Sequence, residues 1–483
     1  MLSTIIAKIE AGARLLPKEA LALWDLDLLT LGRLANRVRV RLHPEPQVTY
    51  VVDRNINYTN ICVSGCRFCA FYRPPGAPGG YVLSEAELAP KLQETKDLGG
   101  SGILLQGGLN PDLPLSYYEN LVKFIRQYGL RVHGFSPPEI VFLSHQTGLS
   151  LTQVLERLVS AGLNSIPGGG AEILVDRVRS ALSPRKCTAA QWLEVMAAAH
   201  RLGLATTATM MFGHLETLAE RTEHLLKIRD LQDETRGFTA FIPWSFQPGG
   251  TALGGETAGS WEYLKTLAVS RLVLDNVPNL QVSWVTQGAK IAQIALSFGA
   301  NDFGSTMLEE NVVAATGVTF RLSETEIRRL ITSAGYEPRI RDHGYGSVAE
   351  GGRGLAAKDY YPQPPSPTSE PRSTGCQPVQ HRQDACAPGQ KCWETRIGLN
   401  PPLPPAGQDA CAPGQRGWGG ELEGRAEEPD SPGSPLKSPH LAIIARVGAH
   451  EDFLRQGVRY VGGRRHATPF GESNPVHLFE HQG

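Results

Sequence analysis

The stretch Asn57-Tyr-Thr-Asn-Ile-Cys-Val-Ser-Gly-Cys-Arg-Phe-Cys-Ala-Phe-Tyr72 places three cysteines, Cys62, Cys66 and Cys69, in the spacing Cys-x-x-x-Cys-x-x-Cys. Thiolates are soft ligands that select iron–sulfur clusters, zinc or copper(I). A four-iron cluster normally takes four cysteines, so three close cysteines predict a cluster with one iron open to a substrate or cofactor. Structural zinc needs four closed ligands, and the next Cys or His after Cys69 is His133. A zinc-binding structural protein is the alternative from a different class.

The composition limits the classes of protein to which the chain can belong. The 483 residues carry 47 Lys and Arg against 48 Asp and Glu, a formal net charge of -1 that gives no reason to expect a nucleic-acid partner. Hydrophobic residues make up 41%, enough for a globular core, yet no apolar run approaches the ~18 residues that span a membrane. Because Lys8 and Glu10 interrupt any signal-peptide core, we expect a cytoplasmic protein with no membrane partner.

Residues 44–347 alternate short apolar runs with longer amphipathic runs, which indicates an α/β fold. The expected strands are Val48–Val52, Gly102–Gln106, Arg131–Phe135, Leu163–Ile166, Ala205–Met211, Gly237–Ile242, Leu280–Val285 and Ala300–Phe303. Capping boxes open several helices between them: Ser84–Glu87, Ser150–Gln153, Thr188–Gln191, Thr217–Glu220 and Ser323–Glu326. Eight such units predict a parallel (β/α)8 barrel of the TIM type. Residues 1–43 have apolar side chains at helical spacing and predict an N-terminal helical cap.

The character of the sequence changes after the expected barrel. Residues 348–439 are dense in Pro, Gly, Ser and Gln, and the segment 383–390 recurs as 408–415. This composition cannot bury enough apolar surface to offset the entropy of ordering, so we expect a disordered, low-complexity segment. Residues 440–483 form a short C-terminal extension to which the sequence assigns no role.

The cysteine spacing resembles that of the radical S-adenosylmethionine (SAM) enzymes, and Phe68, just before the last cysteine, also matches their pattern. The resemblance implies a [4Fe-4S] cluster on Cys62, Cys66 and Cys69, whose open iron chelates the amino and carboxylate groups of SAM. It places the backbone of Gly107 and Gly108 at the SAM amino group. Glu172, after the run Gly168-Gly-Gly170, could bind a SAM ribose hydroxyl or the amino group.

Four further segments, 53–60, 165–174, 207–214 and 301–307, are similar to the cyclic dehypoxanthinyl futalosine synthase family of the futalosine route to menaquinone. The resemblance covers about residues 1–347. It implies that a 5′-deoxyadenosyl radical takes hydrogen from the ribose C4′ of dehypoxanthine futalosine, and that the sugar radical closes a ring on the benzoate. It also implies an electron donor such as flavodoxin or ferredoxin. Aminofutalosine synthase and deazaflavin synthase are related alternatives.

A barrel carries its active site at the carboxyl ends of its strands, and several polar or aromatic residues fall there. We predict Glu139, His214 and Asp302 as catalytic groups for proton transfer. Trp244, Gln247 and Glu310 are the expected substrate-binding residues. A salt bridge, a helix cap or core packing is the alternative role for each of these residues.

Overall fold

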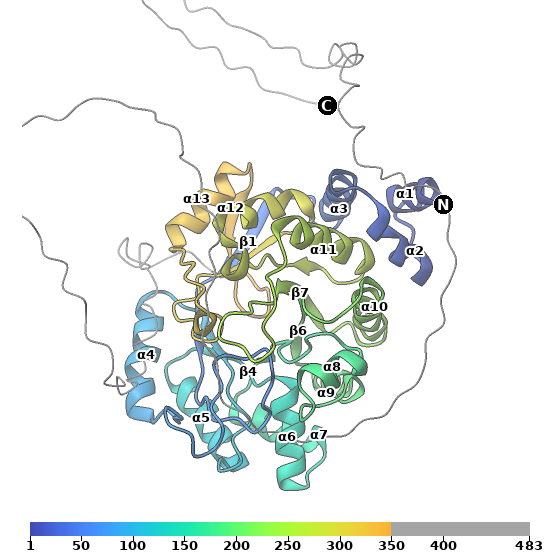
Figure 1. Ribbon diagram of the computed structural model, residues 1–483. Coiled ribbons are helices and arrows are strands. Elements are labelled where there is room, and N and C mark those ends of the chain that lie inside the picture. Colours follow the sequence, from blue (N-terminus) through green and yellow to red (C-terminus); the bar gives the residue numbers. More distant parts are fainter. Residues whose placement is uncertain (349–483) are drawn as a thin grey trace, which may run out of the picture. The chain divides into compact units, whose positions relative to one another are not determined.

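The computed structural model describes residues 1–348. The expected low-complexity segment, apart from residue 348, and the C-terminal extension 440–483 lie outside the described residues. The chain begins with three helices, as predicted: α1 (Leu2–Glu10), α2 (Pro17–Ala22) and α3 (Leu28–Leu42), with a 3-10 turn over Leu23–Asp25. Helix α3 packs against α11 (Ser260–Val273) at the outside of the barrel (Figure 1).

Parallel strands form the centre of the described region. A sheet of seven runs in chain order from β2 to β8. The strands are β1 (Gln47–Val51), β2 (Asp53–Ile56), β3 (Gly102–Leu105), β4 (Arg131–Gly134), β5 (Ser165–Ile166), β6 (Ala205–Phe212), β7 (Phe238–Ser245), β8 (Asn279–Leu280), β9 (Asp302–Ser305) and β10 (Glu337–Ile340).

Hydrogen bonds between the last and first strands close the ring. A parallel bridge joins Gln281, just after β8, to Asp302 of β9, and β9 pairs in parallel with β1. Strand β1 runs into β2 with only Val52 between them. With β1 and β2 taken as one bent strand, the ring has the parallel (β/α)8 arrangement that the sequence predicts.

Several strand bounds differ from expectation, and β2 (Asp53–Ile56) was not predicted as a strand. Strand β7 continues through Ser245, whereas Trp284 and Val285, expected at the end of a strand, begin helix α12 (Trp284–Ala295). The indole Nε1 of Trp284 donates to the Ser305 carbonyl at 2.9 Å, so tertiary packing decides the state of this short apolar run. Strand β10 was not predicted; it pairs with β1 on the side away from β9.

Helices surround the strands on the outside (Figure 1). The remaining ones are α4 (Glu85–Asp97), α5 (Leu115–Gln127), α6 (Pro137–Thr147), α7 (Leu151–Ala161), α8 (Asp176–Leu182), α9 (Ala189–Arg201), α10 (Leu218–Thr235) and α13 (Glu324–Ser333). All five predicted capping boxes are present. A sixth, unpredicted one joins Ser136 to Glu139 at the start of α6. No helix in residues 1–348 is long and apolar enough to cross a membrane.

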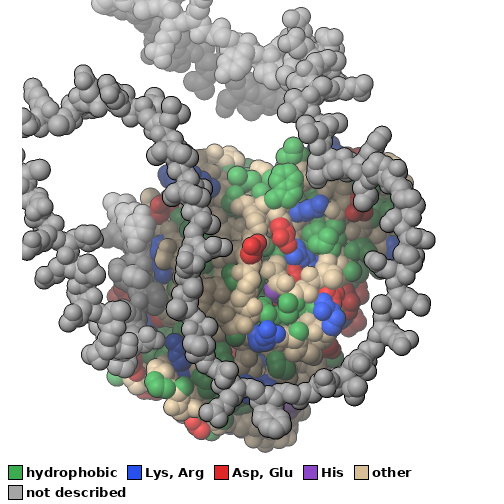
Figure 2. All heavy atoms as spheres, viewed as in Figure 1, with side chains coloured by type: hydrophobic (Ala, Val, Ile, Leu, Met, Phe, Trp, Pro, Cys, Tyr) green, Lys and Arg blue, Asp and Glu red, His purple; other side chains and the backbone are tan. Residues whose placement is uncertain are grey.

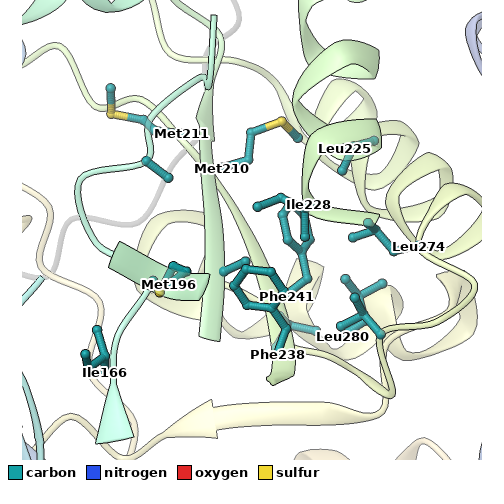
Figure 3. Packing of buried hydrophobic residues seen from close by; sticks show 14 of the residues in the cluster. Ile166, Met196, Met210, Met211, Leu225, Ile228, Phe238, Phe241, Leu274 and Leu280 are labelled. Atoms are coloured by element: carbon teal, nitrogen blue, oxygen red, sulfur yellow. The ribbon is translucent and has the colours of Figure 1, made fainter. Parts of the chain in front are cut away.

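Apolar side chains fill the space between the strands and the outer helices. Figure 3 shows part of this layer, where Phe238 and Phe241 of β7 lie near Leu225 and Ile228 of α10 and are buried with them. Figure 2 shows the face viewed in Figure 1, on which basic and acidic side chains both occur. The mixture of charges agrees with the near-neutral composition.

Candidate active site

The three cysteines lie in the loop that follows β2 and line one pocket. The same pocket is lined by four more of the predicted site residues: Phe68, Gly107, Gly108 and Glu139. Gly107 and Gly108 follow β3, and Glu139 lies just after β4 in α6. The pocket is therefore at the carboxyl ends of the strands, where a barrel carries its chemistry.

Donor groups around the sulfur atoms suit thiolate ligands. The backbone N–H groups of Ser64 and Leu109 donate to Cys62 Sγ at 3.4 and 3.3 Å, and the Ser64 hydroxyl lies 3.1 Å from Cys66 Sγ. Burial raises the pKa of the Cys62 and Cys69 thiols, and backbone N–H groups oppose that rise. Hydrogen bonds to the sulfurs are one means by which a protein tunes an iron–sulfur cluster.

The ligand set argues for a cluster over a structural zinc ion. Cys62, Cys66 and Cys69 line the pocket, whereas the fourth cysteine of residues 1–348, Cys187, does not. In a four-iron cluster each thiolate binds a different iron, whereas structural zinc needs four closed ligands. The residues present therefore fit a [4Fe-4S] cluster with one open iron.

A larger cavity occupies the inside of the barrel and adjoins the cysteine pocket. Gln106, Gly170 and Val312 line both of them. Apolar and aromatic walls come from residues such as Ile242, Trp244, Val282 and Trp284. A substrate in this cavity would lie next to whatever the cysteine pocket holds, shielded from water by the barrel.

Two family models match the chain: the radical SAM superfamily over residues 56–228 and the CofH/MqnC C-terminal region over residues 235–350. A cyclic dehypoxanthine futalosine synthase from Halalkalibacterium halodurans is 45% identical over 345 residues, which are 71% of this chain and 93% of the relative. The chain belongs to the radical SAM superfamily. Its match to the Halalkalibacterium protein places it with the cyclic dehypoxanthine futalosine synthases inside that superfamily.

Two further relatives and one solved structure are similar to this radical SAM enzyme. A second cyclic dehypoxanthine futalosine synthase, from Streptomyces coelicolor, is 42% identical and shares 70% of this chain and 87% of its own. A 5-amino-6-(D-ribitylamino)uracil–L-tyrosine 4-hydroxyphenyl transferase from Archaeoglobus fulgidus is 40% identical, covering 64% and 91%. Among solved structures, methylornithine synthase has a TM-score of 0.56 at 18% identity over 69% of this chain and 97% of its own. That likeness shows the same fold.

Radical SAM enzymes use a [4Fe-4S] cluster and SAM. Close packing at the cysteine pocket explains why residues 107 and 108 beside it are both glycines. A Cβ on Gly107 would come within 2.4 Å of the Tyr58 ring, and one on Gly108 within 2.1 Å of the Ile61 carbonyl oxygen. The second contact is with the backbone of the cysteine loop itself. The glycines thus allow β3 and the cysteine loop to approach each other.

Replacing Gly108 with alanine is expected to disturb the cysteine loop, because the new methyl group overlaps the backbone next to Cys62. Overpacking of this kind costs roughly 1–3 kcal/mol. We expect less iron per chain after anaerobic reconstitution and proportionally less 5′-deoxyadenosine. Gly259→Ala is the matched control, because nothing lies within 4 Å of its added methyl group. Equal iron content in both variants would contradict the prediction.

Glu172, which the resemblance places at SAM, lines the barrel cavity and not the cysteine pocket, and it belongs to an ion-pair network that the sequence did not reveal. Lys186 Nζ is 2.9 Å from Glu172 Oε1, and Arg179 Nη1 is 3.5 Å from Oε2. Burial opposes charge on Lys186, but the nearby Cys66 and Glu172 raise its pKa overall. Lys186 lines the cysteine pocket, with its ammonium group 5.3 Å from the Phe68 ring centre. No motif surrounds this lysine, so only the fold could place it there.

Of the predicted substrate-binding residues, Trp244 and Glu310 line the barrel cavity. The Glu310 carboxylate accepts backbone N–H bonds from residues 312, 313 and 314 at 2.8–2.9 Å, which fixes the loop after β9. Gln247 lines neither cavity; its amide donates to the carbonyl and hydroxyl of Ser245. The roles of these residues stay predictions.

The predicted catalytic residues do not lie together. Glu139 is buried and accepts hydrogen bonds from the Tyr58 hydroxyl at 2.6 Å and from its own capping box, and burial raises its pKa. His214 lines neither cavity and pairs with Glu216 at 2.9 Å. Asp302 is fully buried in an ion pair with Arg341. Only Glu139 borders the cysteine pocket, so the geometry gives the other two no direct path to it.

Proposed function

We propose that the enzyme cyclises dehypoxanthine futalosine to cyclic dehypoxanthinylfutalosinate. The observation that carries the proposal is the 45% and 42% identity to two cyclic dehypoxanthine futalosine synthases over nearly their whole length. The barrel cavity supports it, since its aromatic and apolar walls suit the benzoate ring and the adjoining cysteine pocket suits the cofactor.

The two cavities indicate which part of the reaction the cofactors perform and which part the residues of the chain perform. When bound, the cluster and SAM supply hydrogen-atom abstraction from an unactivated carbon, which no protein side chain can perform. The chain's own residues then have three tasks: to hold the sugar carbon next to the cysteine pocket, to keep the benzoate ring within bonding reach, and to exclude water. Gln106, Gly170 and Val312 border both cavities and mark the place where substrate and cofactor would meet.

A second candidate is the 4-hydroxyphenyl transfer named for the archaeal relatives. It is favoured by their 40% identity over 91% of the Archaeoglobus protein, only slightly less than that of the synthases. Both reactions would use the same cluster and the same cavity. Aminofutalosine synthesis is a third possibility from the same superfamily.

Anaerobic turnover of the reconstituted enzyme separates the candidates. Dehypoxanthine futalosine is supplied with SAM and dithionite, and the products are read by mass spectrometry. We expect a product two hydrogens lighter than the substrate and an equal amount of 5′-deoxyadenosine. A parallel reaction contains tyrosine and 5-amino-6-(D-ribitylamino)uracil, and coupling there without cyclisation would replace the proposal with the transferase. A cytoplasmic location and a flavodoxin or ferredoxin as electron donor are part of the proposal.

A further inference from the structure

Lys186 is the only basic residue among those that line the cysteine pocket in the described part of the chain. Burial raises the pKa of the Cys62 and Cys69 thiols, and the charge of Lys186 is one of the influences that oppose this rise. Glu139, the acidic residue of the lining, has its own pKa raised by burial, which favours its uncharged form. A cluster bound by the cysteines would therefore lie beside one cation.

The ammonium group of Lys186 is held in place beside the cysteine loop. Its Nζ donates to Glu172 Oε1 at 2.9 Å and lies 5.3 Å from the centre of the Phe68 ring, a distance at which a cation and an aromatic ring attract each other. Phe68 lies in the loop between Cys66 and Cys69. The Lys186 side chain is only 14% exposed. Salt therefore screens this charge much less than it screens a surface charge.

Glu172 does not cancel the charge of Lys186, because Arg179 shares the same carboxylate. Arg179 Nη1 is 3.5 Å from Glu172 Oε2, and the side chains of Arg179 and Glu172 are 5% and 6% exposed. Arg179 otherwise donates to backbone carbonyl groups and to the Cys187 sulfur. Two cations and one carboxylate leave one net positive charge in the wall of the pocket.

A positive charge at this place affects the two redox states of a cluster unequally. Reduction adds one electron to a cluster that three thiolates already make anionic, and net charge is one of the properties that set the potential of such clusters. A nearby cation stabilises the more negative, reduced state by the larger amount, and it does so more strongly when it is buried than when water surrounds it.

We propose that Lys186 raises the reduction potential of the [4Fe-4S] cluster and so allows a low-potential one-electron donor to reduce it. The donor loses one electron and the cluster gains it, and no bond forms or breaks in this step. Lys186 acts through its charge on the cluster and not on the substrate. Both candidate reactions use the same cluster, so the inference does not depend on which of them the enzyme performs.

Lys186→Met tests the proposal, because it removes the charge and keeps an unbranched apolar side chain. The reconstituted protein is titrated with dithionite and mediators without SAM, and the reduced cluster is read by electron paramagnetic resonance. At a fixed solution potential, we expect the ratio of reduced to oxidised clusters to fall about tenfold, which lowers the midpoint by ~59 mV. The midpoint does not depend on how many chains hold a cluster, so incomplete reconstitution does not affect the result.

Two further variants separate charge from packing. Lys186→Arg keeps the positive charge and should titrate nearly as the wild type does. Lys227→Met is the matched control: its Nζ is 2.7 Å from Glu223 Oε1, and Lys227 lines neither cavity. An unchanged midpoint in Lys186→Met, or an equal shift in Lys227→Met, would overturn the proposal. A shift that appears only after SAM is added would also overturn it, since Lys186 would then act on SAM and not on the cluster.

Glu172→Gln gives an independent test of the sign. It removes the negative charge between the two cations, so the midpoint should rise, whereas damage to the packing around Lys186 would not reverse the direction. A fall in the midpoint of Glu172→Gln would overturn the proposal. If Lys186→Met takes up no cluster, the direction of the shift in Glu172→Gln decides.

Discussion

Replacing Cys62, Cys66 or Cys69 with alanine is expected to abolish SAM cleavage. The three thiols line one pocket, and hydrogen-bonding groups lie against the sulfurs of Cys62 and Cys66, so each thiol is needed to bind a different iron of the cluster. Losing even a group that supports a ligand costs 10–100-fold in metal affinity or activity, and losing a ligand should cost more than about a hundredfold. Iron per chain, the visible absorbance of the reconstituted protein and 5′-deoxyadenosine formation measure the effect.

The fourth cysteine of the described region provides the control. Cys187 is buried, as Cys66 is, but it lines neither cavity, and its sulfur lies 3.5 Å from Arg179 Nη2. Cys187→Ser should therefore keep the iron content and the SAM cleavage of the wild type. Substantial turnover by one of the three alanine variants would remove that cysteine from the cluster.

Asp302→Ala is expected to destabilise the barrel by roughly 3–5 kcal/mol, because it leaves the buried Arg341 charge unpaired. Asp302 is fully buried and Arg341 is 4% exposed. The carboxylate also receives a hydrogen bond from Thr49 of β1. Asp302 therefore connects β1, β9 and the segment after β10 at the point where the ring closes. Urea unfolding followed by circular dichroism would measure the loss of stability.

Glu337→Ala is the control for this ion pair. Glu337 is the first residue of β10 and pairs with Arg339 at 3.2 Å, but both side chains are more than half exposed. Exposed pairs contribute about 0–1 kcal/mol, so this variant should unfold nearly as the wild type does. An Asp302→Ala protein as stable as Glu337→Ala would show that the buried pair is not needed for closure. That result would favour the alternative prediction, that Asp302 transfers a proton.

Local signals in the sequence predict the scaffold and the pocket that the three cysteines share. Strand–helix alternation predicts the barrel, and all five capping boxes expected from Ser or Thr followed by Glu or Gln are present. The cysteine spacing predicts a shared pocket, because residues so close in one loop can surround a cluster whatever the rest of the fold does. The two glycines after β3 lie at this pocket, where the sequence places them.

Only the tertiary structure decided which buried polar residues face a cavity. Asp302 has the residue type of a catalytic group, yet an ion pair with Arg341 holds its carboxylate, and it lines neither cavity. Lys186 reaches the cysteine pocket from a segment more than a hundred residues further along the chain than the cysteines. His343, in the segment after β10, contacts Asp53 at the start of β2. Such long-range contacts leave no periodic trace in a sequence, because they depend on ring closure and not on local spacing.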